Sequence, residues 1–137
     1  MCRAIQGLPI AVAFFWAAVA GAAAPNWDDL RDLGTVEVVT ADPDGASRET
    51  TVWLVVVDGV GYVRTGNTRW GDNVVRTREL VLRSGEASHP LRVELVEDEA
   101  ERQRIAGVFR EKYGFWDRPA SWIRGARPKI MRLLPKE

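Results

Sequence analysis

Apolar and polar residues alternate along most of this chain in short segments, with the two-residue period that is typical of β-strands. Thr50 to Val57 differs from the rest because nearly every residue in it is apolar, and this predicts a central strand covered on both faces. Together the patterns predict six strands, at residues 35–40, 50–57, 60–65, 78–83, 91–96 and 129–134.

Turn-forming residues separate several of the predicted strands. The sequence Asp42-Pro43-Asp44-Gly45 is a strong turn signal after the first strand, and Ser84-Gly85 marks another turn later in the chain. Asp58-Gly59 is expected to close a tight hairpin, because both residues tolerate the positive φ angles of such turns.

Two helices are predicted from their end signals. Asn26 can cap a short helix that ends near Leu33. The main helix is expected at residues 98–113, with Asp98 as its N-cap and Gly114 as its C-terminal stop. Its apolar stripe consists of Ile105, Val108 and Phe109.

These elements define a fold class. One main helix between late strands predicts a mainly β protein with α, a small six-stranded antiparallel barrel, rather than a βαβ fold. The length of 137 residues fits a single domain.

The N-terminus has the pattern of a secretory signal peptide. Arg3 gives a positive start, Leu8 to Ala20 is almost entirely apolar, and small residues follow as far as Ala24. We therefore expect residues 1–24 to be a signal peptide and residues 25–137 to form a domain that is periplasmic or secreted. An uncleaved membrane anchor is the alternative, although the apolar run is shorter than the about 20 residues of a membrane span.

Charge and residue counts argue against several functions. The 19 basic and 19 acidic side chains balance, so we expect no nucleic-acid partner. Cys2, the single cysteine, lies in the leader, and His89, the single histidine, has no catalytic motif around it. We assign a group of carboxylates to helix capping rather than to a metal site: Glu97, Asp98, Glu99 and Glu101.

Four short motifs resemble the FMN-binding split-barrel superfamily, which includes pyridoxamine phosphate oxidase-like and deazaflavin-dependent oxidoreductase-like proteins. The run from Arg48 to Gly59 resembles the early hairpin of that superfamily, and Tyr62 to Gly66 is similar to the next strand. Asn67-Thr68-Arg69-Trp70 resembles its basic-polar loop, and Lys112-Tyr113-Gly114 resembles the end of its helix. The resemblance covers about half of the chain, implies a split barrel, and is closest to DUF2255-type proteins.

The resemblance implies a site for FMN or a deazaflavin. A flavin phosphate needs cationic side chains and hydroxyl donors that converge, and the fork of an arginine suits phosphate oxygens. The matching positions are Arg48, Thr65, Thr68 and Arg69 for the phosphate, Trp53 and Trp70 as walls for the ring system, and Arg76 as an addition. The loop lacks the lysine that is often found in these families.

Each of these residues also has a structural interpretation. Arg48 and Arg69 fit surface ion pairs, and Trp53 and Trp70 fit the core. The anion site requires that the two arginines approach each other in the folded protein.

Three functions remain open from the sequence. The first is an exported flavin- or deazaflavin-dependent oxidoreductase, in which the cofactor carries out the hydride transfer. The second is a cofactor-free module that binds a small ligand in the same barrel. The third is an interaction protein, such as a homodimer, with an interface at Phe115, Trp116 and Trp122.

Overall fold

Residues 25–114 and 128–136 are described by the structure, which is a computed structural model. The predicted signal peptide and the aromatic residues Phe115, Trp116 and Trp122 lie outside these ranges. The described elements, in chain order, are α2 (Trp27–Leu30), β1 (Thr35–Ala41), β2 (Ser47–Trp53), β3 (Val55–Val57), β4 (Val60–Thr65), α3 (Arg69–Thr77), β5 (Glu79–Ser84), β6 (Ala87–Leu95), α4 (Glu99–Tyr113) and β7 (Lys129–Pro135).

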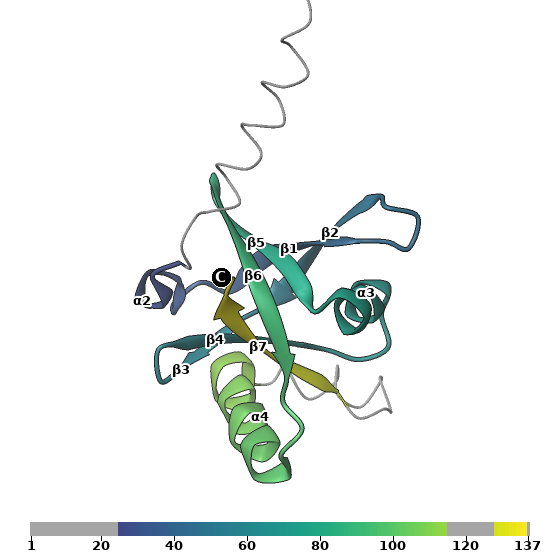
Figure 1. The fold of residues 1–137 in the computed structure, drawn as a ribbon. Helices are drawn as coiled ribbons and strands as arrows, with labels where there is room; N and C mark the ends of the chain where they lie inside the picture. Colours follow the sequence, from purple (N-terminus) through teal and green to yellow (C-terminus); the bar gives the residue numbers. More distant parts are fainter. Residues whose placement is uncertain (1–24, 115–127, 137) are drawn as a thin grey trace, which may run out of the picture.

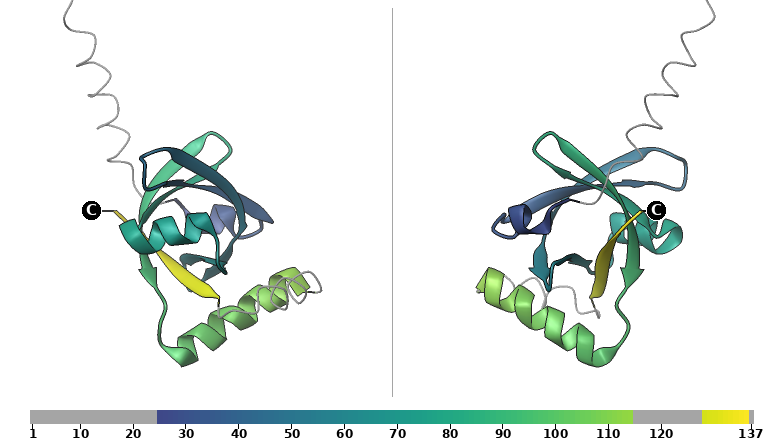
Figure 2. Two further views of the ribbon diagram at one scale, coloured as in Figure 1. Left: turned by 90° about the vertical axis from the view of Figure 1, so that its right-hand side faces the viewer. Right: turned by 60° about the vertical axis from the view of Figure 1, so that its left-hand side comes forward.

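The seven described strands form one antiparallel sheet in the order β2-β1-β5-β6-β7-β4-β3. The sheet curls, so that β2 at one end of this order contacts β4 near the other end. Figure 1 and Figure 2 show the curled sheet with α4 along its lower side and α3 beside β1. The mainly β prediction is confirmed, with seven strands instead of six.

The additional strand arises because the predicted strand at residues 50–57 is two strands. The chain leaves the ladder at Leu54, so that β2 pairs with β1 while β3 pairs with β4, at opposite ends of the strand order. The prediction of a central strand is therefore wrong, since both pieces are edge strands. Burial on both faces is nevertheless real for β3, because Val56 faces the barrel interior and Val55 faces α4.

The backbone of Leu54 is bound by the end of α4 instead of by a neighbouring strand. Its N–H donates to the hydroxyl of Tyr113 at 2.9 Å, and its carbonyl accepts from Nζ of Lys112 at 2.7 Å. The Tyr113 hydroxyl also lies 2.7 Å from the carbonyl of Gly34, and Lys112 reaches the carbonyls of Arg31 and Leu33. These two side chains therefore satisfy the polar groups that the break in the strand leaves without ladder partners.

Burial shifts the pKa of both residues that bind this break. It lowers the pKa of the Lys112 ammonium and raises the pKa of the Tyr113 phenol. The Tyr113 ring also stacks on Trp53, with ring centroids 4.1 Å apart and an interplanar angle of 3°.

Helix α3 was not predicted, because residues 67–70 matched a loop and Arg78 was assigned to the following strand. Instead, Thr68 is the N-cap of α3 and accepts from the N–H of Gly71. Arg78 ends the helix in the left-handed conformation with φ 60°, and its N–H donates to the Val74 carbonyl. The helix is only nine residues long, so its two core residues, Trp70 and Val74, form too short a repeat to stand out in the sequence.

The predicted N-caps of the other two helices, the C-terminal stop of α4 and the predicted hairpin turn at Asp58-Gly59 are confirmed. Asp98 caps α4 by accepting from the N–H of Glu101, and Gly114 follows its last turn with φ 53°. Asn26 caps α2, which ends at Leu30 and so is shorter than predicted. Asp58-Gly59 joins β3 to β4, and both residues have positive φ.

Alternate residues of the strands fill two hydrophobic clusters. One lies inside the curled sheet and includes residues of α2 and α3; its fully buried members are Val38, Leu54, Val63, Val74, Leu82, Leu91, Met131 and Leu133. The other lies between α4 and the strands β3, β4 and β7; it contains Val55, Tyr62, Val96, Ile105, Phe109 and Ile130. Helix α4 is thus held by a core of its own on the outside of the barrel.

Within the described ranges, no helix is long and apolar enough to cross a membrane. In the same residues, no three His, Cys, Asp or Glu side chains lie together as a metal site.

Replacing Tyr113 with Phe should lower the free energy of unfolding by about 1–3 kcal/mol, because the Leu54 N–H then loses its acceptor while the ring stack is kept. Urea denaturation measures the change. Arg110→Gln, on the exposed side of the same helix, is the control and should stay within about 0.5 kcal/mol of wild type. A Tyr113→Phe protein as stable as this control would contradict the role of the hydroxyl.

Stability should fall in acid partly through Glu101. Hydrogen bonds from Arg104, at 2.9 Å, and from Arg132 hold the pKa of Glu101 below its usual range. The unfolded chain takes up this proton near pH 4.3, so the contribution of Glu101 is complete above that pH and is lost as the pH falls through the folded-state pKa. Glu101→Gln should therefore flatten the acid side of a stability–pH curve, whereas the exposed Glu97→Gln should leave it unchanged.

Candidate functional site

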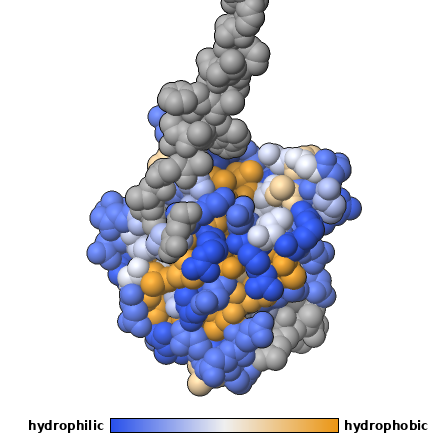
Figure 3. Space-filling view, viewed as in Figure 1, coloured by the Kyte–Doolittle hydropathy of each residue, from blue (hydrophilic) through white to orange (hydrophobic). Residues whose placement is uncertain are grey.

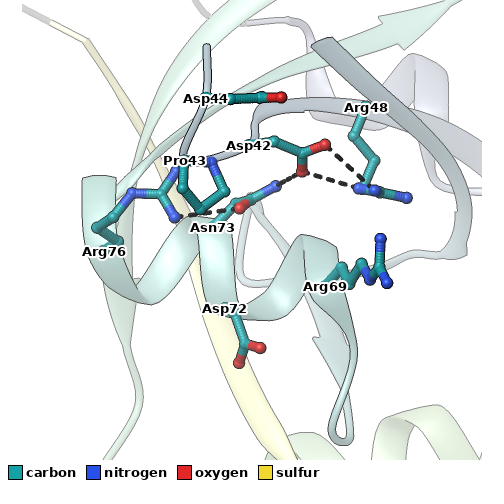
Figure 4. A pocket seen from close by; sticks show the side chains of 8 residues that line it. All are labelled: Asp42, Pro43, Asp44, Arg48, Arg69, Asp72, Asn73 and Arg76. Atoms are coloured by element: carbon teal, nitrogen blue, oxygen red, sulfur yellow. Dashed lines mark hydrogen bonds and ion pairs between the residues drawn. The ribbon is translucent and has the colours of Figure 1, made fainter. Parts of the chain in front are cut away.

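Two of the predicted site residues line one cavity, which we call the arginine cavity. It lies between the β1–β2 turn, the start of β2 and one side of α3, and has a volume of about 460 Å³. Its lining residues are Asp42, Pro43, Asp44, Arg48, Arg69, Asp72, Asn73 and Arg76 (Figure 4). The condition set by the sequence, that Arg48 and Arg69 approach each other, is met.

Arg48 is already paired within the arginine cavity. Its Nε donates to Oδ1 of Asp42 at 2.9 Å, and its second terminal nitrogen donates to Oδ2 at 3.1 Å. These bonds, followed by the one from Asn73, hold the pKa of Asp42 below its usual range, and they raise the pKa of Arg48. The ion-pair interpretation of Arg48 is thus correct, although the pair lines a cavity.

Arg69 contrasts with Arg48 in the same cavity. Figure 4 shows its guanidinium turned toward that of Arg48, whereas Asp72 on the same helix points away. Among residues 25–114 and 128–136, Arg69 makes no hydrogen bond or ion pair, and only its longer-range field acts on Asp42. Arg76 instead uses its guanidinium on the Ala41 carbonyl and on Oδ1 of Asn73.

The other predicted residues line a second cavity, which we call the threonine groove. Its volume is about 340 Å³, and its lining residues are Thr35, Thr51, Val52, Trp53, Arg64, Thr65, Thr68 and Trp70. It lies where the curled sheet brings β2 and β4 together, beside the start of α3. The described lining contains one cationic side chain and no carboxylate, which makes the groove suitable for an electron-rich ligand.

Thr65 and Thr68 share a hydrogen bond of 2.6 Å between their hydroxyl oxygens. The Thr68 oxygen also accepts from the N–H of Gly71 at 3.1 Å. Only one of the two hydroxyl protons can be used between the oxygens, so either direction of this bond leaves one proton for another acceptor. In the described part of the chain no such acceptor is found, and a ligand carbonyl or ring nitrogen could take that place.

The start of α3 packs closely against β4 at this pair. A Cβ atom added at Gly71 would lie 2.6 Å from Cγ2 of Thr65, so a side chain at this position would push the helix away. Gly71 therefore allows the helix to come close enough for the Thr65–Thr68 bond.

The two tryptophans of the groove differ in burial. Trp70 is 5% exposed and belongs to the barrel core, so its predicted core interpretation is correct even though it lines the groove. Trp53 is only partly buried, and its ring stacks on Tyr113. Of the two, Trp53 is the better wall for a planar ligand.

Arg64 lines the groove but was not among the sequence candidates. Its guanidinium carbon lies 4.5 Å from the centroid of the Phe109 ring on α4, a cation–π contact. Arg64 lies in the motif from Tyr62 to Gly66, next to Thr65. Its charge in the mainly apolar run of β4 is the sequence feature that could have identified it as a site residue.

The two cavities draw on the same elements, β2 and α3. Arg48 and Thr51 are three residues apart on β2, which places their side chains on opposite faces of the strand, and Arg69 follows Thr68 directly at the start of α3. The structure therefore divides the six predicted residues between the arginine cavity and the threonine groove. The donors fit a flavin-type ligand, with hydroxyls and an indole at one end and guanidinium groups at the other.

The sequence model of the DUF2255 family, described as an uncharacterized protein conserved in bacteria, matches residues 27–133. No curated protein matches the chain in sequence.

Several solved structures share the fold. HutZ of Vibrio cholerae, described as a haem storage protein, has 18% identity and a TM-score of 0.61, over 82% of this chain and 89% of that chain. An F420-H2-dependent reductase has 16% identity and a TM-score of 0.59, over 74% and 95% of the two chains. A structure described as a domain-swapped dimer has 15% identity and a TM-score of 0.62, over 90% and 96%. At these identities the similarity shows the fold alone, and it confirms the predicted split barrel.

Replacing Thr68 with Val should destabilise the protein by about 1 kcal/mol more than replacing Thr65 with Val, because only Thr68 also caps α3. Thermal or urea denaturation of both variants checks the order. Thr51→Val, an exposed threonine of the same groove, is the control and should be close to wild type. Equal losses in both variants would mean that the cap contributes little.

Proposed function

Because this chain belongs to the DUF2255 family and has a split-barrel domain, we propose that it binds a flavin or a deazaflavin. The observation that carries this proposal is the placement of the six predicted residues in two cavities that both draw on β2 and the start of α3, one rich in hydroxyls and one lined by arginines. A ligand with a planar polar ring and a negatively charged side chain matches both ends.

Different residues of the chain would bind the ring and the charged end of the ligand. Trp53 would pack against the ring, and the spare hydroxyl proton of the Thr65–Thr68 pair would donate to a polar atom on it. Arg69, which has no partner among the described residues, would bind the charged end. When bound, the group would supply hydride transfer, and the protein would act as an oxidoreductase without a nucleophile of its own.

We further propose that this binding takes place outside the cytoplasm. The support is the arrangement of Arg3, the apolar run and the small residues in the first 24 positions. The protein would then acquire its ligand after export, and a cofactor-free module that binds a small anion is the alternative function.

A homodimer is part of the same proposal. The similar structure described as a domain-swapped dimer supports it, as does the face viewed in Figure 3, where apolar residues are exposed between hydrophilic ones. Mixed surfaces of this kind are common in protein interfaces. Gel filtration distinguishes the dimer from a monomer.

Titration of the protein, expressed from the full-length sequence, with FMN, riboflavin, a deazaflavin and haem tests the proposal by visible absorption and fluorescence. We expect a flavin or deazaflavin to bind. Thr65→Val should weaken the binding of every flavin by several-fold, because the ring loses a hydrogen-bond donor. Arg69→Ala should lower the affinity for FMN by about tenfold, since it removes a charge-assisted contact to the phosphate.

Arg92→Ala is the matched control, because Arg92 is an exposed arginine on β6 that lines neither cavity. A colourless protein that binds none of the four ligands would refute the proposed function and favour the cofactor-free module.

A further inference from the structure

The arginine cavity contains an anion of its own at the place where a ligand phosphate would bind Arg48. Both carboxylate oxygens of Asp42 accept from the Arg48 guanidinium, at 2.9 and 3.1 Å. This two-point contact is the geometry with which a guanidinium binds a ligand carboxylate or phosphate. Asp42 therefore competes with any ligand anion for Arg48.

Asp42 is fixed in this position by a buried neighbour. The side-chain nitrogen of Asn73, which is 2% exposed, donates to Oδ1 of Asp42 at 2.8 Å and to the Thr40 hydroxyl at 3.0 Å. Arg76 in turn donates to Oδ1 of Asn73 at 3.2 Å. Displacing Asp42 from Arg48 would disturb this network, so an incoming anion has to bind beside the carboxylate.

The charges of the lining residues determine how much negative charge on a ligand the cavity can neutralise. Its lining contains three arginines and three aspartates. Where the guanidinium groups of Arg48 and Arg69 face each other, Asp42 offsets one of the two positive charges, and Asp72 points away (Figure 4). The other two lining charges, those of Arg76 and Asp44, have opposite signs, and that of Asp44 also acts on Arg48. One net positive charge is therefore left for a ligand, whereas a phosphate monoester carries about 1.5 to 2 negative charges at neutral pH.

We infer that Asp42 determines the charge of the ligand that this protein accepts. The arginine cavity matches an end group with at most one negative charge, such as a carboxylate, and gives a phosphate dianion little net attraction. This inference rests on the proposed function for the identity of the ring, but the charge preference is a property of the cavity alone.

Riboflavin and FMN test the inference, because they share the ring and differ by the terminal phosphate. Wild type should bind the two with affinities within about threefold of each other, since the attraction of Arg69 and the repulsion of Asp42 offset one another. Asp42→Asn keeps the shape of the side chain and removes its negative charge. The variant should therefore bind FMN about tenfold more tightly than wild type and riboflavin with the same affinity. Asp29→Asn is the matched control, because Asp29 is an exposed aspartate on α2 that lines neither cavity, and it should leave the ratio unchanged.

Two results would overturn the inference. One is a wild-type protein that binds FMN at least ten times more tightly than riboflavin, and the other is an Asp42→Asn protein with the wild-type ratio. If Asp42→Asn does not fold, Asp42→Ser provides the same loss of charge at a turn position.

Inorganic phosphate separates this inference from the proposed function. If no flavin binds to any variant, the proposed function fails, and the melting temperature in phosphate is compared with that in chloride at equal ionic strength. Phosphate should then raise the melting temperature of Asp42→Asn and not that of wild type. Equal responses of the two proteins would refute the role of Asp42.

Discussion

The break of the strand at Leu54 is the constraint on which the rest of this structure depends. At the break, the chain passes from β2, which pairs with β1, to β3, which pairs with β4 at the opposite end of the same sheet. The break leaves the N–H and the carbonyl of the fully buried Leu54 without partners in the sheet. Tyr113 and Lys112 supply these partners. The end of α4 therefore stabilises the closure of the barrel through hydrogen bonds made 58 and 59 residues away along the chain.

Closure of the sheet also forms the threonine groove. Because β2 is brought to β4, residues from both strands face each other across the groove, and the start of α3 completes it. The stack of Trp53 on Tyr113 connects the wall of the groove to the residue that binds Leu54. The threonine groove and the closure of the barrel thus share the same aromatic contact.

In the arginine cavity, the charge available to a ligand depends on which arginines are already paired. Its arginines are not equivalent, because Asp42 neutralises Arg48 and Asn73 holds Asp42 in place, while Arg69 makes no bond to the described residues. A pattern of arginines in a sequence therefore does not give the charge that a cavity offers to a ligand. In this protein the turn before β2 supplies the compensating carboxylate, six residues from Arg48.

The sequence by itself determined most of the strands, the turns, the caps of α2 and α4 and the resemblance to split barrels, because these depend on neighbouring residues and on short periods. It also identified Arg48 and Arg69, which share a cavity. Only the tertiary structure decided that the strand at residues 50–57 breaks, that α3 is a helix and that Arg64 lines the groove. It also decided the pairing of Arg48 with Asp42. These features arise from contacts between distant segments, such as Tyr113 with Leu54, and such contacts leave no local pattern in the sequence.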